Sequence, residues 1–394
     1  MIYIKKVTSL PDKKIMSQLP LEGLIVLEFC QYLSGPSAGL RLADMGARVI
    51  KIENRKNGDG CRQLPIKNLW VDDSSLLFHT INRNKESFAA DLKDPDDISL
   101  IKKLIEKADV ITQNFRPGIM EKFGLGYDAV KSINPKIIYA EITGYGKKGP
   151  WKDKPGQDLL LQSMSGLVFT TGNADENPVP FGISITDIIC GAHLVQGILA
   201  ALIRRQKRGV GALIEVSLME SLIDFQFELF TTFYCSGLIP KRSLVNNGHP
   251  LLSAPYGIYA TADGFIAIAM APVERISDVL EIPELKNFQQ ADAFRKRDEI
   301  KNILSELLLT KCSDHWLRKL KAADIWSAGV MNWQQMQESE GYKVLQMEQV
   351  ISNSKGRKIT TTRCPVRING KKLFSENPAP ELGEHTLKII EEFF

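Results

Sequence analysis

Two aspartates stand where a carboxylate could do covalent chemistry. Asp187 lies in the segment 182–191, just ahead of a long apolar stretch, and Asp158 follows Gly156-Gln157. A carboxylate at a helix N-terminus is kept ionised by the helix dipole. An ionised, poorly solvated carboxylate can attack an activated acyl group as a nucleophile. Both positions equally suit ordinary helix caps, so residue type alone leaves the two roles open.

A second candidate is a group of polar and basic residues in short loops. The segment 82–85, Asn-Arg-Asn-Lys, is typical of a solvated turn. It could also gather positive charge for a phosphorylated ligand, because four further cations lie in neighbouring loops. They are Arg55, Lys56, Arg116 and Lys122.

Other enzyme chemistries find little support. The loop 33–39, Leu-Ser-Gly-Pro-Ser-Ala-Gly, is not the G-x-G-x-x-G of dinucleotide-binding proteins, and Pro36 lacks a backbone donor that a pyrophosphate needs. The sequence has no G-x-S-x-G elbow, no P-loop and no H-E-x-x-H motif. Cys312-x-x-His315 stands without partners, so no metal site is expected.

The elements that must position these residues alternate between strand and helix. Apolar runs and caps predict strands at 23–29, 48–52, 110–112, 137–143 and 212–216, and helices at 36–44, 95–108, 127–133 and 188–205. This pattern indicates an α/β fold with a mostly parallel sheet. Ligands in such sheets bind beyond the carboxyl ends of the strands, here the loops 31–35, 54–59, 114–118 and 144–149.

The second half of the chain predicts a smaller domain. One helix is expected over 219–233, then a hairpin whose strands, 256–261 and 265–270, flank Asp263-Gly264, and then helices to about residue 321. A strand pair around Asn369-Gly370 and a helix over 384–393 follow. We expect a large domain of residues 21–224 and 326–394, a small domain of residues 225–325, and an N-terminal extension of residues 1–20.

Composition bounds the class of protein. The 394 residues are 44% hydrophobic and 24% charged, as in globular proteins, and a net charge of +4 is too weak to indicate nucleic-acid binding. Six cysteines are scattered without C-x-x-C pairs, which favours a reduced, cytoplasmic protein. They are Cys30, Cys61, Cys190, Cys235, Cys312 and Cys364.

Neither a secretory signal nor a membrane span is expected. The first 20 residues are basic but lack a continuous apolar region, and Met16 is a candidate natural start. The most apolar stretch, 182–203, carries polar groups such as Asp187 and His193, which predicts a buried helix.

An ordered series of short motifs runs through residues 21–386. They are Asn82-Arg-Asn-Lys, Asp91-Leu-Lys, Ala108-Asp-Val, Asn114-Phe-Arg-Pro-Gly, Phe123-Gly-Leu-Gly-Tyr, Asn134-Pro, Thr143-Gly-Tyr-Gly, Gln162-Ser-Met-Ser-Gly, Gly209-Val-Gly with Val216-Ser-Leu, and Pro378-Ala-Pro-Glu-Leu-Gly-Glu-His-Thr. In this order they resemble the class III CoA-transferases, the family that includes formyl-CoA transferase and carnitine CoA-transferase.

The resemblance implies a fold, an assembly and a reaction. The large domain would be Rossmann-like and CoA-binding, and two chains would interlock as a ring-like homodimer. Asp187 takes the place of the family's nucleophile. It would attack the donor thioester to form a mixed anhydride and then an aspartyl-CoA thioester, without a permanently bound cofactor. Coenzyme A enters as a substrate, with small carboxylic acids as the other partners.

The resemblance also implies the CoA contacts, carried over position by position. They are Gln31, Tyr32, Leu33, Ser34, Leu92, Lys93, Asn114, Phe115, Arg116 and Lys122. A family arginine beside the adenine is Asn54 here, with Arg55 next to it. A glutamine near the intermediates of formyl-CoA transferase is Leu33, and a glycine-rich flap is reduced to Asn246-Asn-Gly248, so formyl or oxalate specificity is not expected.

Two alternatives stay open. The α-methylacyl-CoA racemases of the same superfamily pair the aspartate with a histidine in a Gly-His-Asp motif, which is Gly156-Gln157-Asp158 here. A glutamine amide has no useful acid–base pKa, which disfavours two-base racemisation and leaves Gln157 and Asp158 as auxiliary candidates. The other alternative is a CoA-binding protein without activity. The sequence names neither the donor nor the acceptor acid.

Overall fold

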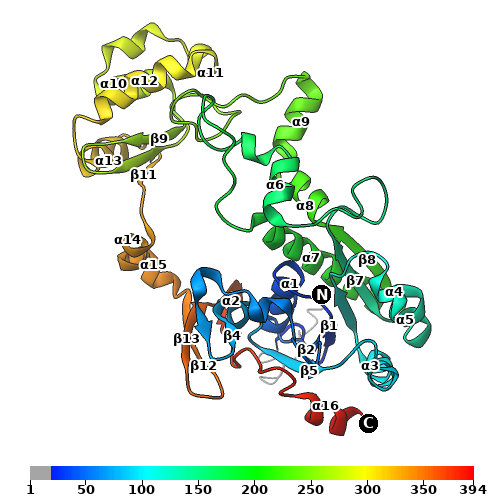
Figure 1. Ribbon diagram of the computed structural model, residues 1–394. Helices are drawn as coiled ribbons and strands as arrows, with labels where there is room; N and C mark the ends of the chain where they lie inside the picture. Colours follow the sequence, from blue (N-terminus) through cyan, green and yellow to red (C-terminus); the bar gives the residue numbers. More distant parts are fainter. Residues whose placement is uncertain (1–18) are drawn as a thin grey trace, which may run out of the picture. The chain divides into compact units, whose positions relative to one another are not determined.

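The computed structural model describes residues 19–394, so the expected start at Met16 and most of the N-terminal extension lie outside the described residues. The chain divides into two compact units (Figure 1). Unit 1 comprises residues up to Pro155, Asp187–Ser221 and Gln346–Phe394. Unit 2 comprises Gly156–Thr186 and Leu222–Leu345. The division differs from the expected one by placing residues 156–186, 222–224 and 326–345 in the smaller unit.

Unit 1 is built on a six-stranded parallel sheet in the order β5-β2-β1-β6-β7-β8. The strands are β1 (Ile25–Glu28), β2 (Arg48–Glu53), β5 (Lys85–Ala89), β6 (Val110–Gln113), β7 (Ile138–Thr143) and β8 (Ala212–Ser217). From β1 the chain builds outwards through β2 and β5, then returns to β1 and builds the other way. The loops after β1 and β6 therefore meet where the strand order reverses, which is where ligands bind in such sheets.

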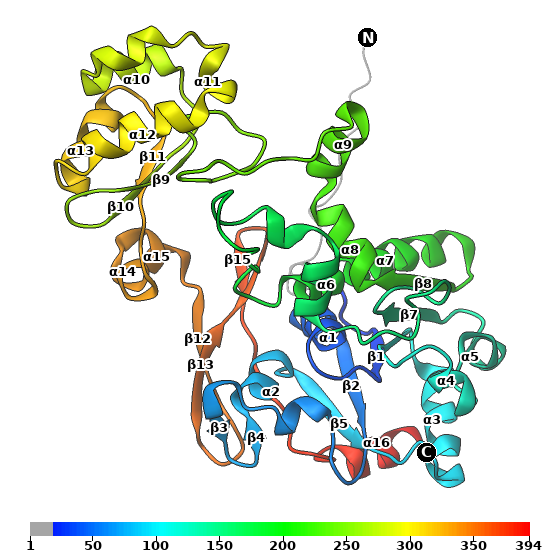
Figure 2. The same ribbon diagram turned by 45° about the horizontal axis from the view of Figure 1, so that its top comes forward.

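Helices cover both faces of this sheet, as the strand–helix alternation predicts. On one face, α3 (Pro95–Lys107), α5 (Tyr127–Ile133) and α16 (Thr386–Phe393) bury residues such as Ile105, Val130 and Ile389 against the strands. On the other face, α1 (Ser34–Asp44) contacts β1 and β2, and α7 (Ile185–Arg208) approaches β8 at Gly197 (Figure 2). The expected mixed α/β class is confirmed.

Smaller elements surround the sheet of unit 1. The helical ones are η1 (Gly60–Gln63), η2 (Ile66–Asn68), α2 (Leu76–Ile81) and α4 (Ile119–Lys122). The strand pairs are β3 (Trp70–Val71) with β4 (Ser74–Ser75), β12 (Glu348–Ser352) with β13 (Lys358–Thr362), and β14 (Cys364–Ile368) with β15 (Lys371–Leu373). The last pair was expected around Asn369-Gly370, whereas the β12–β13 hairpin was not.

Unit 2 has its own core. An antiparallel sheet of β9 (Gly257–Ala260), β10 (Phe265–Ile268) and β11 (Ser327–Gly329) packs with nearby helices around Tyr259, Leu304 and Trp316. The helical elements are α6 (Asp158–Met164), η3 (Leu167–Phe169), α9 (Phe227–Ser236), α10 (Val273–Leu280), η4 (Pro283–Asn287), α11 (Asp292–Arg295), α12 (Arg297–Leu308), α13 (Ser313–Ala322), α14 (Trp333–Glu338) and α15 (Glu340–Leu345). The hairpin predicted at Asp263-Gly264 is confirmed.

Two local expectations were wrong. The helix expected over 219–233 is two helices, α8 (Leu218–Phe225) and α9, because Gln226 leaves the helical conformation and its buried amide bonds the Leu222 carbonyl. Asp187 is not a helix cap, since α7 starts at Ile185 and places the carboxylate inside the first turn.

The helix predicted as buried over the stretch 182–203 is buried on one face only. By length and composition α7 could cross a membrane, but it packs on the sheet through residues such as Leu194 and Ile198, both fully buried. Of the most apolar 18-residue stretch of α7 only 39% is buried, and Ile188 and Ile203 are exposed.

Candidate active site

The loop after β1 is the centre of the candidate site. Its central segment is Gln31–Ser34, and Gln31 is bracketed by the Asn114 side chain from the loop after β6. The Gln31 amide donates to Asn114 Oδ1 (2.8 Å), and Asn114 Nδ2 donates to the Gln31 carbonyl (2.7 Å). These two bonds join the loops at the point where the strand order reverses. Asn114 therefore supports the loop through its side chain.

A cavity of about 210 Å³ opens beside this loop, at the carboxyl ends of β1, β2 and β5. Four predicted ligand-contact positions line it, namely Gln31, Leu92, Lys93 and Phe115, together with Asn54, where the resembling family has an arginine. Its other walls include Ile52, Ala90 and Phe123, which makes it largely apolar. The cavity is smaller than the usual site for a whole drug-sized ligand and suits one planar group.

Three predicted cations are exposed near these strand ends. Lys93, Arg116 and Lys122 form no ion pair with any residue in the range 19–394. Arg55 differs, because its guanidinium is ion-paired with Asp97 and lies 3.6 Å from Asp94. The predicted role of Arg55 as a ligand contact therefore competes with a pair already made in the fold.

The remaining residues of the loop point in different directions. Tyr32 is 53% exposed and has a positive φ of 65°. Leu33 packs against a small buried cluster that includes Cys61 and Phe78, and Ser34 is buried as the first residue of α1. Leu33 and Ser34 are therefore fixed in the fold, whereas Tyr32 is presented to solvent.

Asp187 lies in unit 1 on the helix that packs against this loop. Gly191, four residues later, touches the start of α1: a Cβ there would lie 2.7 Å from the Ser34 carbonyl oxygen and 2.3 Å from Ser37 Oγ. Residues four apart share a helix face, so Asp187 lies on the face of α7 that meets the loop. It is half-buried in the first turn, where the helix dipole stabilises a carboxylate.

Asp158 and Gln157 lie in unit 2 and play different parts there. Asp158 Oδ1 accepts from the Thr186 amide (2.8 Å), and its Oδ2 accepts from Gln162 Nε2 (2.6 Å). Asp158 therefore holds the first turn of α7. It does not cap α6, the ordinary role that its sequence position suited, because the N-cap of α6 is Gln157. Gln157 is exposed at the N-cap of α6.

The segment expected as a flap, Asn246-Asn-Gly248, is tied into unit 2. The Asn246 carbonyl accepts from the buried Lys301 ammonium (3.1 Å), and the Asn246 side chain donates to Ser305 (2.6 Å). Burial lowers the pKa of Lys301 to about 8. A Cβ on Gly248 would lie 2.8 Å from the Tyr256 ring.

Sequence reasoning missed a cluster of buried charges under the loop. Glu28, Lys51 and Lys85 lie on adjacent strands, and both ammonium groups contact the Glu28 carboxylate. A charged residue inside an otherwise apolar strand run, as in Ile25–Glu28, was the available signal. The two nearest thiols are poor nucleophiles, because burial raises the pKa of Cys30 far above its ordinary value and that of Cys61 to about 12.

The described residues contain no group of three or more His, Cys, Asp or Glu side chains able to hold a metal ion. What the arrangement offers is a half-buried carboxylate at a helix N-terminus, a ligand loop in contact with that helix, an apolar cavity and exposed cations. Such a set fits nucleophilic attack by a carboxylate on an anionic, activated acyl compound.

Comparison with known proteins points the same way. The sequence profile of CoA-transferase family III matches residues 21–386. The chain is 33% identical to the succinate–glutarate CoA-transferase of Agrobacterium fabrum, over 98% of this chain and 97% of that protein. It is 32% identical to the acetyl-CoA:oxalate CoA-transferase of Acetobacter aceti, over 95% and 96%. A crystal structure of a CAIB/BAIF family protein from Brucella suis superposes with a TM-score of 0.83 at 31% identity, over 96% of this chain and all of that one.

Proposed function

This chain belongs to CoA-transferase family III, and we propose that it passes CoA from an acyl-CoA donor to a free carboxylic acid through covalent intermediates on Asp187. The observation that carries the proposal is the close approach of Gly191 to Ser34 and Ser37. It joins the helix that bears the nucleophile to the loop at the ligand-binding edge of the sheet. A carboxylate and a bound thioester can meet there without a large movement.

The reaction proceeds in four exchanges. The Asp187 carboxylate attacks the thioester carbonyl, which forms a mixed anhydride and releases CoA thiolate. The thiolate attacks the aspartyl carbonyl of the anhydride, which forms an aspartyl-CoA thioester and releases the donor acid. The acceptor carboxylate attacks this thioester and again frees the thiolate. The thiolate then attacks the acceptor's acyl carbon, which yields the new acyl-CoA and restores Asp187.

Each step keeps one acyl group activated, so neither ATP nor a resident cofactor is required, and coenzyme A is consumed and formed as a substrate. The α7 dipole favours the ionised nucleophile, whose attack requires the unprotonated form. Water must stay out, because it would hydrolyse both the anhydride and the thioester.

The cavity beside β1, β2 and β5 supports a site for the adenine ring, which is planar and apolar on both faces. Phe115 offers an aromatic wall, and the side chain of Gln31 offers polar contacts, since its backbone is already bonded to Asn114. Lys93, Arg116 and Lys122 are assigned to the CoA phosphates, because exposed cations attract an anionic ligand and form charge-assisted hydrogen bonds with phosphate oxygens.

A homodimer completes the proposal, with the two chains interlocked as rings. Its support is apolar surface that a monomer leaves open. In unit 2, α9 buries no residue, and Phe227, Tyr234 and Ile239 are 67%, 72% and 75% exposed. In unit 1, Ile188 and Ile203 on α7 are also exposed. Sedimentation velocity is expected to give about twice the 44.1 kDa of one chain.

The proposed substrates are short carboxylic acids, with dicarboxylates first. The name of the Agrobacterium fabrum relative, succinate–glutarate CoA-transferase, supports that order. None of the six cysteines is paired, which supports the prediction of a reduced, cytoplasmic protein.

Intact-mass spectrometry tests the covalent step. The protein is mixed briefly with succinyl-CoA, acetyl-CoA or butyryl-CoA and quenched, with a parallel sample trapped by hydroxylamine. A CoA-sized adduct on the peptide that contains Asp187 is expected, along with its loss in Asp187→Asn. The control is Asp153→Asn, which removes an exposed carboxylate far from the α7 sequence and should retain the adduct.

The other outcomes separate the alternatives. Deuterium uptake at the α-carbon of a branched acyl-CoA without an adduct would favour the racemase. CoA binding with neither signal, across a panel that includes glutaryl-CoA, would favour a protein that binds CoA without turning it over. Either result would refute the aspartyl mechanism.

A further inference from the structure

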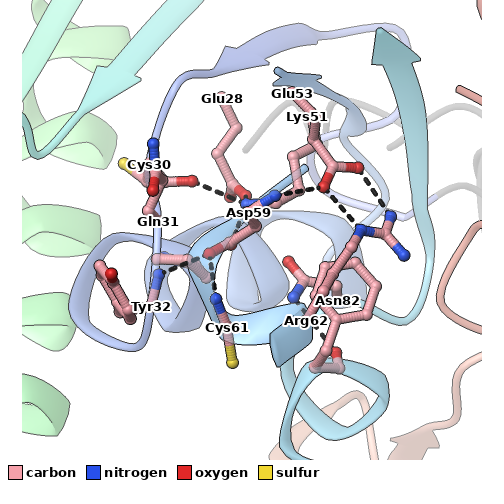
Figure 3. Close-up of polar contacts among 12 residues, drawn as sticks. Glu28, Cys30, Gln31, Tyr32, Lys51, Glu53, Asp59, Cys61, Arg62 and Asn82 are labelled. Atoms are coloured by element: carbon pink, nitrogen blue, oxygen red, sulfur yellow. Dashed lines mark hydrogen bonds and ion pairs between the residues drawn. The ribbon is translucent and has the colours of Figure 1, made fainter. Parts of the chain in front are cut away.

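Six charged side chains are buried beneath the loop Gln31–Ser34, and the proposed reaction uses none of them. All but Lys85 are labelled in Figure 3. No member is more than 4% exposed, and acids and bases balance: Glu28, Lys51, Glu53, Asp59, Arg62 and Lys85. Buried ion pairs contribute little net stability, because the desolvation of both charges offsets their attraction. Stability alone therefore does not account for this cluster.

The two lysines hold the ends of the loop. Lys51 Nζ donates to the Cys30 carbonyl (2.7 Å), just before the loop, and Lys85 Nζ donates to the Pro36 carbonyl (2.9 Å), just after it. Glu28 contacts both ammonium groups, at 3.0 Å and 2.9 Å. Both ends of the loop are thereby fixed to the sheet below.

Asp59 holds the middle of the loop. Its Oδ1 accepts from the Tyr32 amide (2.9 Å) and from the Cys61 amide (2.8 Å), and its Oδ2 lies 2.8 Å from Lys51 Nζ. Burial by itself would raise the pKa of Asp59, but the Lys51 ammonium brings that pKa below its ordinary value. The acceptor is therefore a carboxylate anion near neutral pH, which strengthens its bonds to both amides.

Tyr32 needs such a restraint. Its φ of 65° lies in the left-handed region, which is sterically disfavoured for a residue with a side chain. The ring lies over Gly60, where a Cβ would be 2.6 Å from Tyr32 Oη. A strained residue at a ligand loop persists only when its surroundings enforce the conformation.

We propose that Asp59, held by Lys51, is a positioning residue for the CoA thioester: it enforces the left-handed conformation of Tyr32 and so gives the loop Gln31–Ser34 the shape that binds the substrate. The inference rests on the proposed CoA site. Asp59 lines the proposed adenine cavity, but its Oδ1 is taken by the Tyr32 and Cys61 amides, so the role proposed for it is exerted through the loop. Its loss weakens the binding of acyl-CoA and leaves the binding of the acceptor acid unchanged.

The test compares Asp59→Ala with Asp59→Asn. Alanine removes both amide bonds and is expected to raise KM for acyl-CoA, and Kd for CoA by calorimetry, at least tenfold. Asparagine retains an oxygen that can accept from both amides, so it should recover most of that loss. KM for the acceptor acid should stay within twofold in both variants. Partial unfolding would instead lower the apparent kcat without raising KM.

Further variants separate positioning from folding. Asp44→Ala is the matched control, because Asp44 is equally buried but bonds Arg83 and Ser375 instead; it should lose thermal stability and keep KM. Should Asp59→Ala not fold, the neutral pair Lys51→Met with Asp59→Leu leaves no unpaired charge at this site and should still raise KM. In a Tyr32→Gly background, where a positive φ carries no strain, Asp59→Ala should raise KM less than threefold.

Three results would overturn the inference: KM within twofold of wild type in both the alanine variant and the neutral pair, an equal rise in Asp44→Ala, or an undiminished effect in the Tyr32→Gly background. Failure of the proposed function looks different. Wild-type protein would then form no adduct at Asp187, and if it also showed no CoA affinity, both proposals would end.

Discussion

Gly191→Ala tests whether α7 and the loop after β1 must touch for catalysis. The added methyl group would lie 2.3 Å from Ser37 Oγ and 2.7 Å from the Ser34 carbonyl oxygen. The hydroxyl can rotate away, but the carbonyl belongs to the backbone and cannot. An ordinary contact starts at 3.4 Å, so helix and loop must separate by about 0.7 Å.

The size of the effect follows from this shift. Overpacking of this kind costs about 1–3 kcal/mol of stability. A misplacement approaching 1 Å can lower a rate by up to about 100-fold when reacting groups must be aligned, so we expect kcat to fall roughly 10- to 100-fold. Initial rates are measured by chromatography of the CoA esters, and stability by thermal unfolding.

Gly197→Ala is the matched control on the same helix. Its methyl group would lie 2.6 Å from Ile214 Cγ2, a side-chain atom of β8 far along α7 from the loop. Both substitutions gain the same helix propensity and incur a similar overpacking cost. Gly197→Ala should therefore lose stability and keep kcat within threefold. Equal kcat values in the two variants would refute the argument that the Gly191 contact positions Asp187.

Three further predictions concern charge. Arg62→Met leaves Glu53 buried without its bidentate partner and should lower the free energy of unfolding, measured in urea, by about 3–5 kcal/mol. The double variant with Glu53→Gln should recover much of that loss. An unchanged free energy of unfolding in the single variant would contradict the pairing. Lys301 has a folded-state pKa of about 8, below its ordinary 10.5, so unfolding takes up a proton between these two pH values. The urea midpoint of the wild type should therefore rise relative to that of Lys301→Met as the pH is raised from 8 to 10. A difference between the two midpoints that does not change with pH would contradict the lowered pKa. In calorimetry, Arg116→Ala should raise Kd for CoA about tenfold at low salt and less at high salt. Arg55→Ala should change Kd less than threefold, because the Arg55 side chain is already paired with Asp97. A larger rise in Kd for Arg55→Ala than for Arg116→Ala would contradict the assignment of the phosphate contacts.

Much of the large unit could be predicted because its signals are local. The helix α3 follows an aspartate cap, a proline in the first turn and a repeating apolar face, and α5 ends before Asn134-Pro135 as predicted. The strand–helix alternation indicated the parallel sheet. Where a distant contact takes part, prediction failed: at the break between α8 and α9 the buried Gln226 amide donates to the Ser165 carbonyl, 61 positions away, as well as to the Leu222 carbonyl.

The candidate site, too, could be predicted only in part. The ordered motifs singled out Asp187 and the loop Gln31–Ser34, but not the buried charges that hold that loop. Glu28 and Lys51 are 23 positions apart and become partners only because β1 pairs with β2 in one register. Asp158, a possible auxiliary residue, accepts a hydrogen bond from the Thr186 amide, a contact that the sequence did not indicate.

By itself, the sequence determined the helices and strands with local caps and periodicity, the family, and the identity of the candidate nucleophile. Only the tertiary structure decided which carbonyls the buried lysines hold, why Tyr32 keeps a positive φ, and how closely Gly191 meets the loop. The physical reason is that caps and periodicity act over a few residues, whereas strand register, burial and close packing join residues far apart in the chain.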